Sequence, residues 1–190
     1  MGITPQQASE VLATADLLYS QSDVERAFDR MALEITGKLS GKNPLVLCIL
    51  NGALIPAGHL LTRLHFPLRQ DYVHATRYRG DIIGAELEWI GRPSSSLEGE
   101  TVLVIDDILD QGVTLEAIVM ACREAGARQV YSAVMVEKIH DRGNGFHADF
   151  IGLHVEDRYV FGFGMDYMEY YRNLPGIYAV GPASPGASDT

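Results

Sequence analysis

The sequence has few basic residues and no long apolar run, and each shortage argues against a class of protein. It carries 15 Lys and Arg against 25 Asp and Glu, a formal net charge of -10. This balance argues against sequence-independent nucleic-acid binding, because that mode neutralises phosphates with clustered cations. No stretch of about 18 or more apolar residues is present, and the first residues lack the basic-then-apolar order of a signal peptide. We therefore expect a cytoplasmic protein that binds neither nucleic acid nor a membrane.

Cysteine is also scarce. Cys48 and Cys122 are the only two in the chain, and each lies inside an apolar stretch. Cysteines in this setting are typical of a reduced core and not of a disulfide framework or a thiolate metal site. We expect neither of them to take part in chemistry.

The acidic balance also bears on how the chain would bind a phosphorylated ligand. With cations scarce, such binding would depend on metal ions, backbone amides and a few locally placed Lys or Arg side chains. A phosphate-binding function would therefore imply a divalent metal.

Apolar runs alternate with helical patterns along the chain. At 190 residues and 47% hydrophobic content, one compact domain is expected. The first forty residues predict two helices, the second opening with Ser22 and Glu25 in capping-box spacing. Downstream, the patterns predict strands at Leu45–Leu50, Gln70–Thr76, Thr101–Ile105 and Val130–Val136, with helices after the first and third. A charged, Gly-containing link at Arg77–Ala85 follows the second strand, and that segment ends at Glu86–Ile90. Such alternation favours an α/β fold with a doubly wound, mostly parallel sheet, in which ligands bind beyond the carboxyl ends of the strands.

The segment Val102–Leu115 (VLVIDDILDQGVTL) carries most of the functional argument. A buried strand leads into Asp106 and Asp107, whose carboxylates suit sugar hydroxyls and a metal ion. The amides that follow, from Asp110 to Thr114, surround Gly112 at a helix N-terminus and can hold a phosphate. Acids at a strand end also occur in phosphoacceptor domains or as solvated loops. The ordered strand, acids, glycine turn and helix favour a phosphorylated sugar as the ligand.

This segment resembles the phosphoribosyl pyrophosphate motif of type I phosphoribosyltransferases. The resemblance covers about 45–180, and Val155–Val180 is similar to the purine-binding segment of the hypoxanthine-guanine branch. It implies a type I phosphoribosyltransferase fold with a hood formed by both terminal segments. We expect one domain over 1–180, with a core at about 40–155, a hood from about 1–40 and 155–180, and a flexible tail at 181–190.

The resemblance also assigns the residues of the phosphoribosyl site. Asp110 would be the general base that takes or holds the N7 proton of the purine while N9 attacks the anomeric carbon. Asp106 and Asp107 would contact the ribose hydroxyls. The phosphoribosyl group would be bound by Asp106, Asp107, Asp110, Gln111, Gly112, Val113 and Thr114. A simple helix cap is the alternative for Asp110.

The purine site is implied by residues further along the chain. Tyr159 resembles the residue that stacks on the base, and Val160 would add main-chain contacts. Lys138 resembles the lysine that donates to the purine O6, which favours a 6-oxopurine over adenine. Asp166 would adjoin the purine and hold a second Mg²⁺, so the metal ligands would be Asp106, Asp107 and Asp166. The alternatives are a core strand for Tyr159 and Val160 and a surface lysine for Lys138.

The remaining implied sites concern the leaving group and a lid. Leu50, Asn51 and Gly52 resemble the pyrophosphate loop, which in this family contains a cis peptide between its first two positions. Arg172 resembles the cation on the pyrophosphate, with a surface pair to Glu169 as the alternative. Arg77 and Tyr78 match the lid that closes over the sugar.

Three positions depart from the family pattern. Asn51 stands where many members have Lys, Gln111 where Thr or Ser is frequent, and Val113 where Lys or Arg is frequent. Backbone amides bind most of the phosphate, so the changes bear on substrate affinity more than on the type of reaction.

The resemblance implies Mg²⁺, phosphoribosyl pyrophosphate, hypoxanthine and guanine as ligands, and a homodimer or homotetramer. Two alternatives within the superfamily are an enzyme for xanthine or a pyrimidine, and a nucleotide-sensing regulator that binds RNA or DNA. A phosphoacceptor signalling domain explains the acids but leaves the 159–172 segment without a role.

Overall fold

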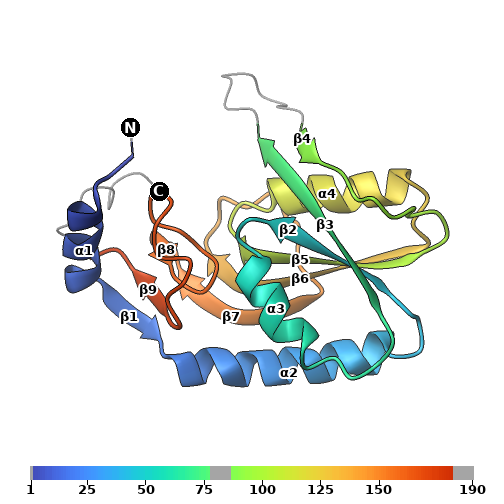
Figure 1. The fold of residues 1–190 in the computed structure, drawn as a ribbon, viewed down its shortest axis with the longest axis horizontal. Coiled ribbons are helices and arrows are strands. Elements are labelled where there is room, and N and C mark those ends of the chain that lie inside the picture. The colour runs from blue at the N-terminus through green and yellow to red at the C-terminus, as the bar shows by residue number, and fades with distance from the viewer. Residues whose placement is uncertain (1, 78–86, 182–190) are drawn as a thin grey trace.

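The computed structural model describes residues 2–77 and 87–181, which form a large sheet, a small sheet and four α-helices (Figure 1). The large sheet consists of β2 (Leu45–Leu50), β3 (Arg69–Arg77), β4 (Leu87–Gly91), β5 (Thr101–Leu109), β6 (Gln129–Ile139) and β7 (Phe150–Glu156). The small sheet consists of β1 (Asp16–Tyr19), β8 (Val160–Phe161) and β9 (Ile177–Ala179). The helices are α1 (Pro5–Thr14), α2 (Gln21–Leu39), α3 (Leu54–Leu61) and α4 (Val113–Glu124).

The large sheet has the strand order β4-β3-β2-β5-β6-β7. All its strand pairs are parallel except β3 with the edge strand β4. Helix α4 covers one face of this sheet, and α2 and α3 cover the other (Figure 1). The predicted doubly wound, mostly parallel fold is therefore confirmed.

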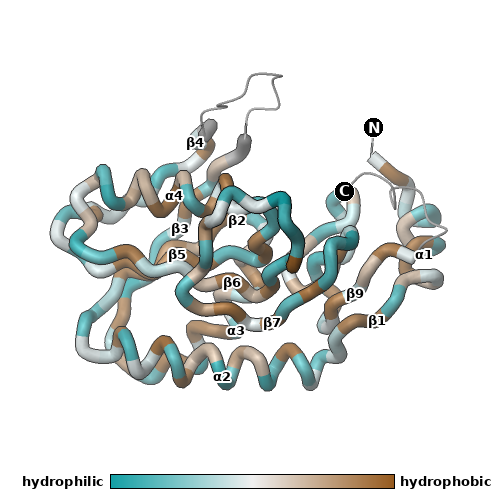
Figure 2. The backbone as a smooth tube through the Cα atoms, turned by 180° about the vertical axis from the view of Figure 1, so that it is seen from behind, coloured by the Kyte–Doolittle hydropathy of each residue, from teal (hydrophilic) through white to brown (hydrophobic). Residues whose placement is uncertain are grey.

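The core explains why the central strands are apolar on both faces. Residues Val102–Ile105 of β5 and Ala133–Val136 of β6 are almost fully buried, as parallel strands between two helical layers must be. Helix α2 alternates along its length between hydrophilic and hydrophobic segments (Figure 2), and its buried side chains, including Phe28 and Ile35, face the core. Helix α2 contacts β7, and α4 contacts β5 and β6.

The small sheet joins the two ends of the described chain. Strand β1 pairs antiparallel with β9, and β9 pairs with β8, so segments far apart in the sequence form one unit. This unit lies beside the end of the large sheet at which β5 and β6 terminate (Figure 1). The ring of Phe163 lies 5.3 Å from that of Phe28 and 4.8 Å from that of His59, which packs this C-terminal segment against α2 and α3.

The N-terminal region differs from the prediction in two ways. The prediction of two helices is incomplete, because the short strand β1 separates α1 from α2. The predicted capping box at Ser22 and Glu25 is wrong. Ser20 is the N-cap of α2, its side chain accepts from the Asp23 amide, and Asp23 accepts from the Ser20 amide at 2.9 Å. The helix therefore begins one residue before Ser22, which lies inside its first turn.

Two strands extend further than their apolar runs. Strand β5 continues to Leu109 and β6 to Ile139, so Asp106, Asp107 and Lys138 lie within the last residues of strands. Strand β7 was not predicted at all.

Within the described part of the chain, no helix is both long and apolar enough to cross a membrane. Residues 182–190 of the predicted tail lie outside the described residues.

Candidate active site

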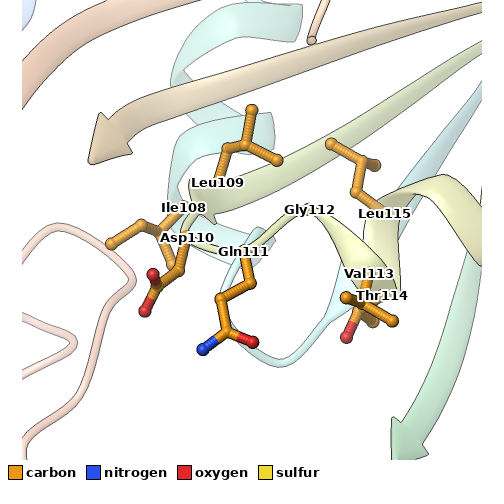
Figure 3. A pocket seen from close by; sticks show the side chains of 8 residues that line it. All are labelled: Ile108, Leu109, Asp110, Gln111, Gly112, Val113, Thr114 and Leu115. Carbon is orange, nitrogen blue, oxygen red and sulfur yellow. The ribbon is translucent and has the colours of Figure 1, made fainter. Parts of the chain in front are cut away.

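The turn between β5 and α4 lines a cavity of about 280 Å³ with eight consecutive residues, from Ile108 to Leu115. Gly112, the N-cap of α4, has φ 82°, and a Cβ there would lie 2.6 Å from Oδ1 of Asn144. Glycine is therefore required by both backbone conformation and space. Asp110, Gln111 and Thr114 carry their polar atoms on one side of the turn, and Leu109 and Leu115 point to the other (Figure 3). Backbone amides at the start of α4 make this turn suitable for a phosphate group.

Asp106 and Asp107 are both largely withdrawn from solvent. Asp106 is 9% exposed, and the Asp107 side chain is 14% exposed. Burial raises the pKa of Asp106 well above its usual range, and the charge of Asp107 adds to the effect. Burial also raises the pKa of Asp107, although its hydrogen bond with Asp106 and the charge of Arg172 partly oppose that rise. Two buried acids with raised pKa values would bind a cation or sugar hydroxyls favourably.

The loop after β2 lies directly against these acids. The Leu50–Asn51 peptide bond is cis, the feature that the family has in the loop these residues resemble. A Cβ on Gly52 would lie 2.1 Å from Oδ2 of Asp107, and a Cβ on Gly164 would lie 2.3 Å from the Gly52 carbonyl oxygen. The loop is therefore held between β5 and the C-terminal segment at distances that only glycine permits.

Arg172 lies on the same side of the site. Its guanidinium pairs with Asp166, donates to the Gly164 carbonyl oxygen at 2.6 Å, and lies 3.8 Å from Oδ2 of Asp107. The alternative of a surface pair with Glu169 is not what the structure shows, because the acid that pairs with Arg172 is Asp166. Asp166 also accepts a hydrogen bond from the backbone N–H of Glu169. The structure therefore brings together Arg172, Asp166 and Asp107 from two distant segments.

The residues predicted to bind the purine line one cavity of about 220 Å³. It is lined by Asp107, Ile108, Asp110, Lys138, Tyr159, Val160, Met165 and Asp166. Tyr159 is half-buried and meets the Tyr167 ring edge to face, with centroids 5.3 Å apart. Burial raises the pKa of the Tyr159 hydroxyl, with a further contribution from Asp166. A partly apolar cavity with a few polar groups suits a heteroaromatic base.

Lys138 is not a surface lysine. Its side chain is only 8% exposed, and Nζ lies 3.1 Å from Oδ2 of Asp110 and 3.9 Å from Oδ1 of Asp157. A buried ammonium group of this kind requires partners, and both partners are acids, of which Asp110 also lines the cavity. The snorkelling alternative is therefore wrong.

Asp110 has an environment unlike that of the two buried acids. Its side chain is 40% exposed, and its Oδ1 lies 2.7 Å from Nε2 of His140. Partial burial alone would raise its pKa, but the hydrogen bond from His140 and the charge of Lys138 outweigh burial and hold the pKa of Asp110 below its usual value. Asp110 is therefore kept ionised, as the predicted role of general base requires.

Sequence reasoning missed three residues of this network. His140 contacts Asp110, and Nη2 of Arg142 lies 4.0 Å from it. The same Nη2 donates to both carboxylate oxygens of Asp157, at 2.6 and 2.7 Å. Asp110, His140 and Asp157 bring possible metal-ligand atoms within 4.8 Å of one another. Because Lys138 and Arg142 already neutralise these acids, we interpret the cluster as an ion-paired network. One signal in the sequence could have predicted His140. It lies two residues after Lys138 at the end of a strand, and alternate residues of a strand share a face.

The predicted lid lies outside the described part of the chain. Arg77 ends β3, but its side chain and all of Tyr78 are not described, so the lid stays a prediction.

The two cysteines are free thiols. Burial raises the pKa of both Cys48 and Cys122 to about 11. Both are therefore unreactive core residues, as expected.

Comparison with known proteins agrees with this geometry. Residues 14–169 match the model of the phosphoribosyl transferase domain family. The chain therefore belongs to the phosphoribosyltransferase family. It is 31% identical to the hypoxanthine-guanine phosphoribosyltransferase of Bacillus subtilis over 88% of this chain and 93% of that protein. It is 32% identical to the hypoxanthine-guanine-xanthine phosphoribosyltransferase of Tritrichomonas foetus over 85% of this chain and 88% of that one.

Other relatives are longer, and one solved structure is close. The chain is 33% identical over 87% of its length to the bifunctional protein TilS/HprT of Listeria innocua, but it spans only 26% of that relative. The crystal structure of a hypoxanthine phosphoribosyltransferase from Staphylococcus aureus superposes with a TM-score of 0.83 at 28% identity, covering 88% of this chain and 91% of that one. The predicted family and fold are thereby confirmed.

Proposed function

We propose that this chain transfers the 5-phosphoribosyl group from phosphoribosyl pyrophosphate to N9 of hypoxanthine or guanine, giving IMP or GMP and pyrophosphate in purine salvage. The observation that carries the proposal is the base cavity, which is lined by Lys138, Tyr159 and Asp110. Asp110 also lines the cavity at the turn of residues 110–114, which we call the phosphate turn. Similarity to hypoxanthine-guanine phosphoribosyltransferases over most of the chain supports the same class of base.

The phosphate turn and the buried acids would hold the sugar phosphate. Amides of 110–114 bind the 5-phosphate, since they stand at the positive end of the α4 dipole. Asp106 and Asp107 accept from the ribose hydroxyls. Leu50, Asn51 and Gly52 contact the pyrophosphate with their backbone, and Arg172 neutralises part of its charge as it departs.

Mg²⁺ fits the acids that the chain offers. Burial raises the pKa values of Asp106 and Asp107, so a bound cation would favour their ionised form, and Asp107 and Asp166 line the same cavity. Hard carboxylate oxygens are the ligands that Mg²⁺ prefers. When bound, the ion would neutralise the diphosphate leaving group.

Asp110 and Lys138 would act on the base. Asp110 accepts the N7 proton as the N9–C1′ bond forms, and its lowered pKa keeps it ready to accept. Lys138 donates to O6, so the 6-amino group of adenine would face a cation with no acceptor between them. Tyr159 stacks on the ring, and the Val160 backbone contacts its edge.

Several finer points belong to the same proposal. Asn51 lacks the positive charge of the lysine that many family members have there, so Arg172 and the loop amides bind more of the pyrophosphate. With Gln111 and Val113 in the turn at 110–114, the phosphate is bound through the backbone amides. Closure of a lid containing Arg77 and Tyr78, a division into core and hood within 1–180, and a homodimer or homotetramer remain proposals. So does a cytoplasmic location.

The test is a spectrophotometric assay of purified protein with Mg²⁺ and phosphoribosyl pyrophosphate, offering hypoxanthine, guanine, xanthine, adenine and uracil in parallel. We expect nucleotide from hypoxanthine or guanine and little from adenine or uracil. Product from xanthine alone would move the assignment to another base. If no base reacts although phosphoribosyl pyrophosphate binds, the chain is a nucleotide-sensing regulator instead.

A further inference from the structure

His140 follows the last residue of β6 and is buried against the candidate general base. Its side chain is 6% exposed, and both ring nitrogens have partners. Nε2 lies 2.7 Å from Oδ1 of Asp110, and Nδ1 accepts from the backbone N–H of Arg142 at 3.0 Å. A buried imidazole with two such partners has a fixed ring orientation.

The contact with Arg142 also fixes where the ring hydrogen lies. A backbone N–H can only donate, so Nδ1 must be unprotonated to receive it. The ring hydrogen is therefore on Nε2, which donates to Asp110. This is the arrangement that holds a carboxylate in place.

The two oxygens of Asp110 consequently have different partners. Oδ1 receives His140 and has Arg142 at 4.0 Å, while Oδ2 lies 3.1 Å from Lys138. Arg142 is held by its pair with Asp157, which also lies 3.9 Å from Lys138. These are the charged groups that face His140 and Asp110 among the described residues. Asp110 and Lys138 both line the base cavity, and Oδ2 is the oxygen that Lys138 contacts and His140 does not, so we assign Oδ2 to the bound purine.

We propose that His140 is a positioning residue for Asp110, on which the proposed reaction depends. It occupies Oδ1 so that Oδ2 alone takes the purine proton. In that step the N9–C1′ bond forms, the C1′–O bond to pyrophosphate breaks with its electron pair leaving on the pyrophosphate, and the N7 proton passes to Oδ2. His140 keeps its own proton throughout. This inference rests on the proposed function, since it assigns a role within the same site.

The experiment compares three variants of the full chain. His140→Phe keeps the ring shape but removes the donor, and His140→Gln restores an N–H donor. His154→Phe is the matched control, because His154 also contacts a carboxylate, Glu137 at 3.0 Å, but is 58% exposed. We expect His140→Phe to lower kcat roughly 10- to 100-fold with an unchanged Kd for phosphoribosyl pyrophosphate, because backbone amides bind its phosphate. His140→Gln should recover part of the loss, and His154→Phe should behave as wild type.

A second measurement does not need activity. Long-range ¹H–¹⁵N spectroscopy of the histidine rings should show His140 protonated on Nε2 and not on Nδ1. A hydrogen on Nδ1 would overturn the inference even if the chain proved inactive with every base, an outcome that would defeat the proposed function alone. If the wild type is active, three results also overturn the inference. The kcat of His140→Phe could be unchanged, or its kcat and substrate binding could fall together. His140→Gln could also be as slow as His140→Phe.

Discussion

The end of β5 carries two sets of aspartates whose environments are opposite. Asp106 and Asp107 are buried, and burial raises the pKa values of both. Asp110 lies a few residues later with 40% of its side chain exposed, and the donor His140 and the cation Lys138 lower its pKa. In the buried pair the effect of burial exceeds that of Arg172, which lies 3.8 Å from Asp107, whereas at Asp110 the donor and the cation outweigh burial. The difference teaches that one short segment can prepare one site for a cation and sugar and another for proton transfer.

The largest expected effect is on Asp110, the proposed proton acceptor. Asp110→Asn should lower kcat by about 10²–10⁴-fold, since the amide cannot take a proton. Its Kd for phosphoribosyl pyrophosphate with Mg²⁺ should change little, because the turn binds through its backbone. Steady-state kinetics and equilibrium binding check both halves. A large loss of binding with the rate preserved would reverse the roles assigned to the two sets of acids.

The next effect concerns the cation that Asp110 shares with the base cavity. Lys138→Gln should lower kcat/KM for hypoxanthine roughly 10- to 100-fold, as expected for one charge-assisted hydrogen bond. The preference over adenine should narrow, because the 6-amino group no longer meets a cation. Lys42→Gln is the control, since Lys42 instead contacts Gln129 and Tyr131 at 2.9 Å. Unchanged base preference in Lys138→Gln contradicts its role at O6.

The buried pair should respond through binding and not through proton transfer. Asp107→Asn should weaken the binding of phosphoribosyl pyrophosphate with Mg²⁺ by roughly 10-fold, because one carboxylate ligand is lost. Calorimetric titration with and without EDTA measures the change. If Asp107→Asn and wild type bind equally well in Mg²⁺, this aspartate is not part of the metal and sugar site.

The smallest effect is on stability without metal. An acid whose pKa is raised in the folded protein destabilises the fold as pH rises through that pKa, from the ordinary value of 3.8 upward. In EDTA, thermal stability of the wild type should therefore fall with rising pH across this window. Asp106→Asn should reduce that fall, because the amide does not titrate and so removes the raised pKa of this position. An identical pH dependence in both proteins would contradict the claim that burial raises the pKa of Asp106.

Contiguous parts of the site could be predicted from the sequence, and dispersed parts could not. The strand, acids and glycine turn of Val102–Leu115 are local, so spacing was enough to predict their arrangement. Strand β1 was missed because Asp16–Tyr19 forms a strand only by pairing with β9 near the other end of the chain. No local pattern encodes such a partner.

The partners of Asp110 were missed for a similar reason. Its hydrogen bond joins the turn after β5 to His140 after β6, and Asp157 lies beyond the end of β7. The register of β6 with β7 pairs Lys138 with Val155 and brings these strand ends together. Register depends on packing across the sheet, so a single sequence shows the residues but not their meeting.

Proton release on substrate binding tests the contrast between the two sets of acids most directly. Calorimetric titration of phosphoribosyl pyrophosphate with Mg²⁺, at a series of pH values from acid to neutral and in buffers of different ionisation enthalpy, counts the protons released. We predict that, at the pH where release is greatest, the wild type and Asp110→Asn release the same number and Asp106→Asn releases fewer, because ligand binding favours the ionised form of the buried acids and leaves Asp110 as it was. Equal release from Asp106→Asn and wild type, or a loss confined to Asp110→Asn, would contradict the account.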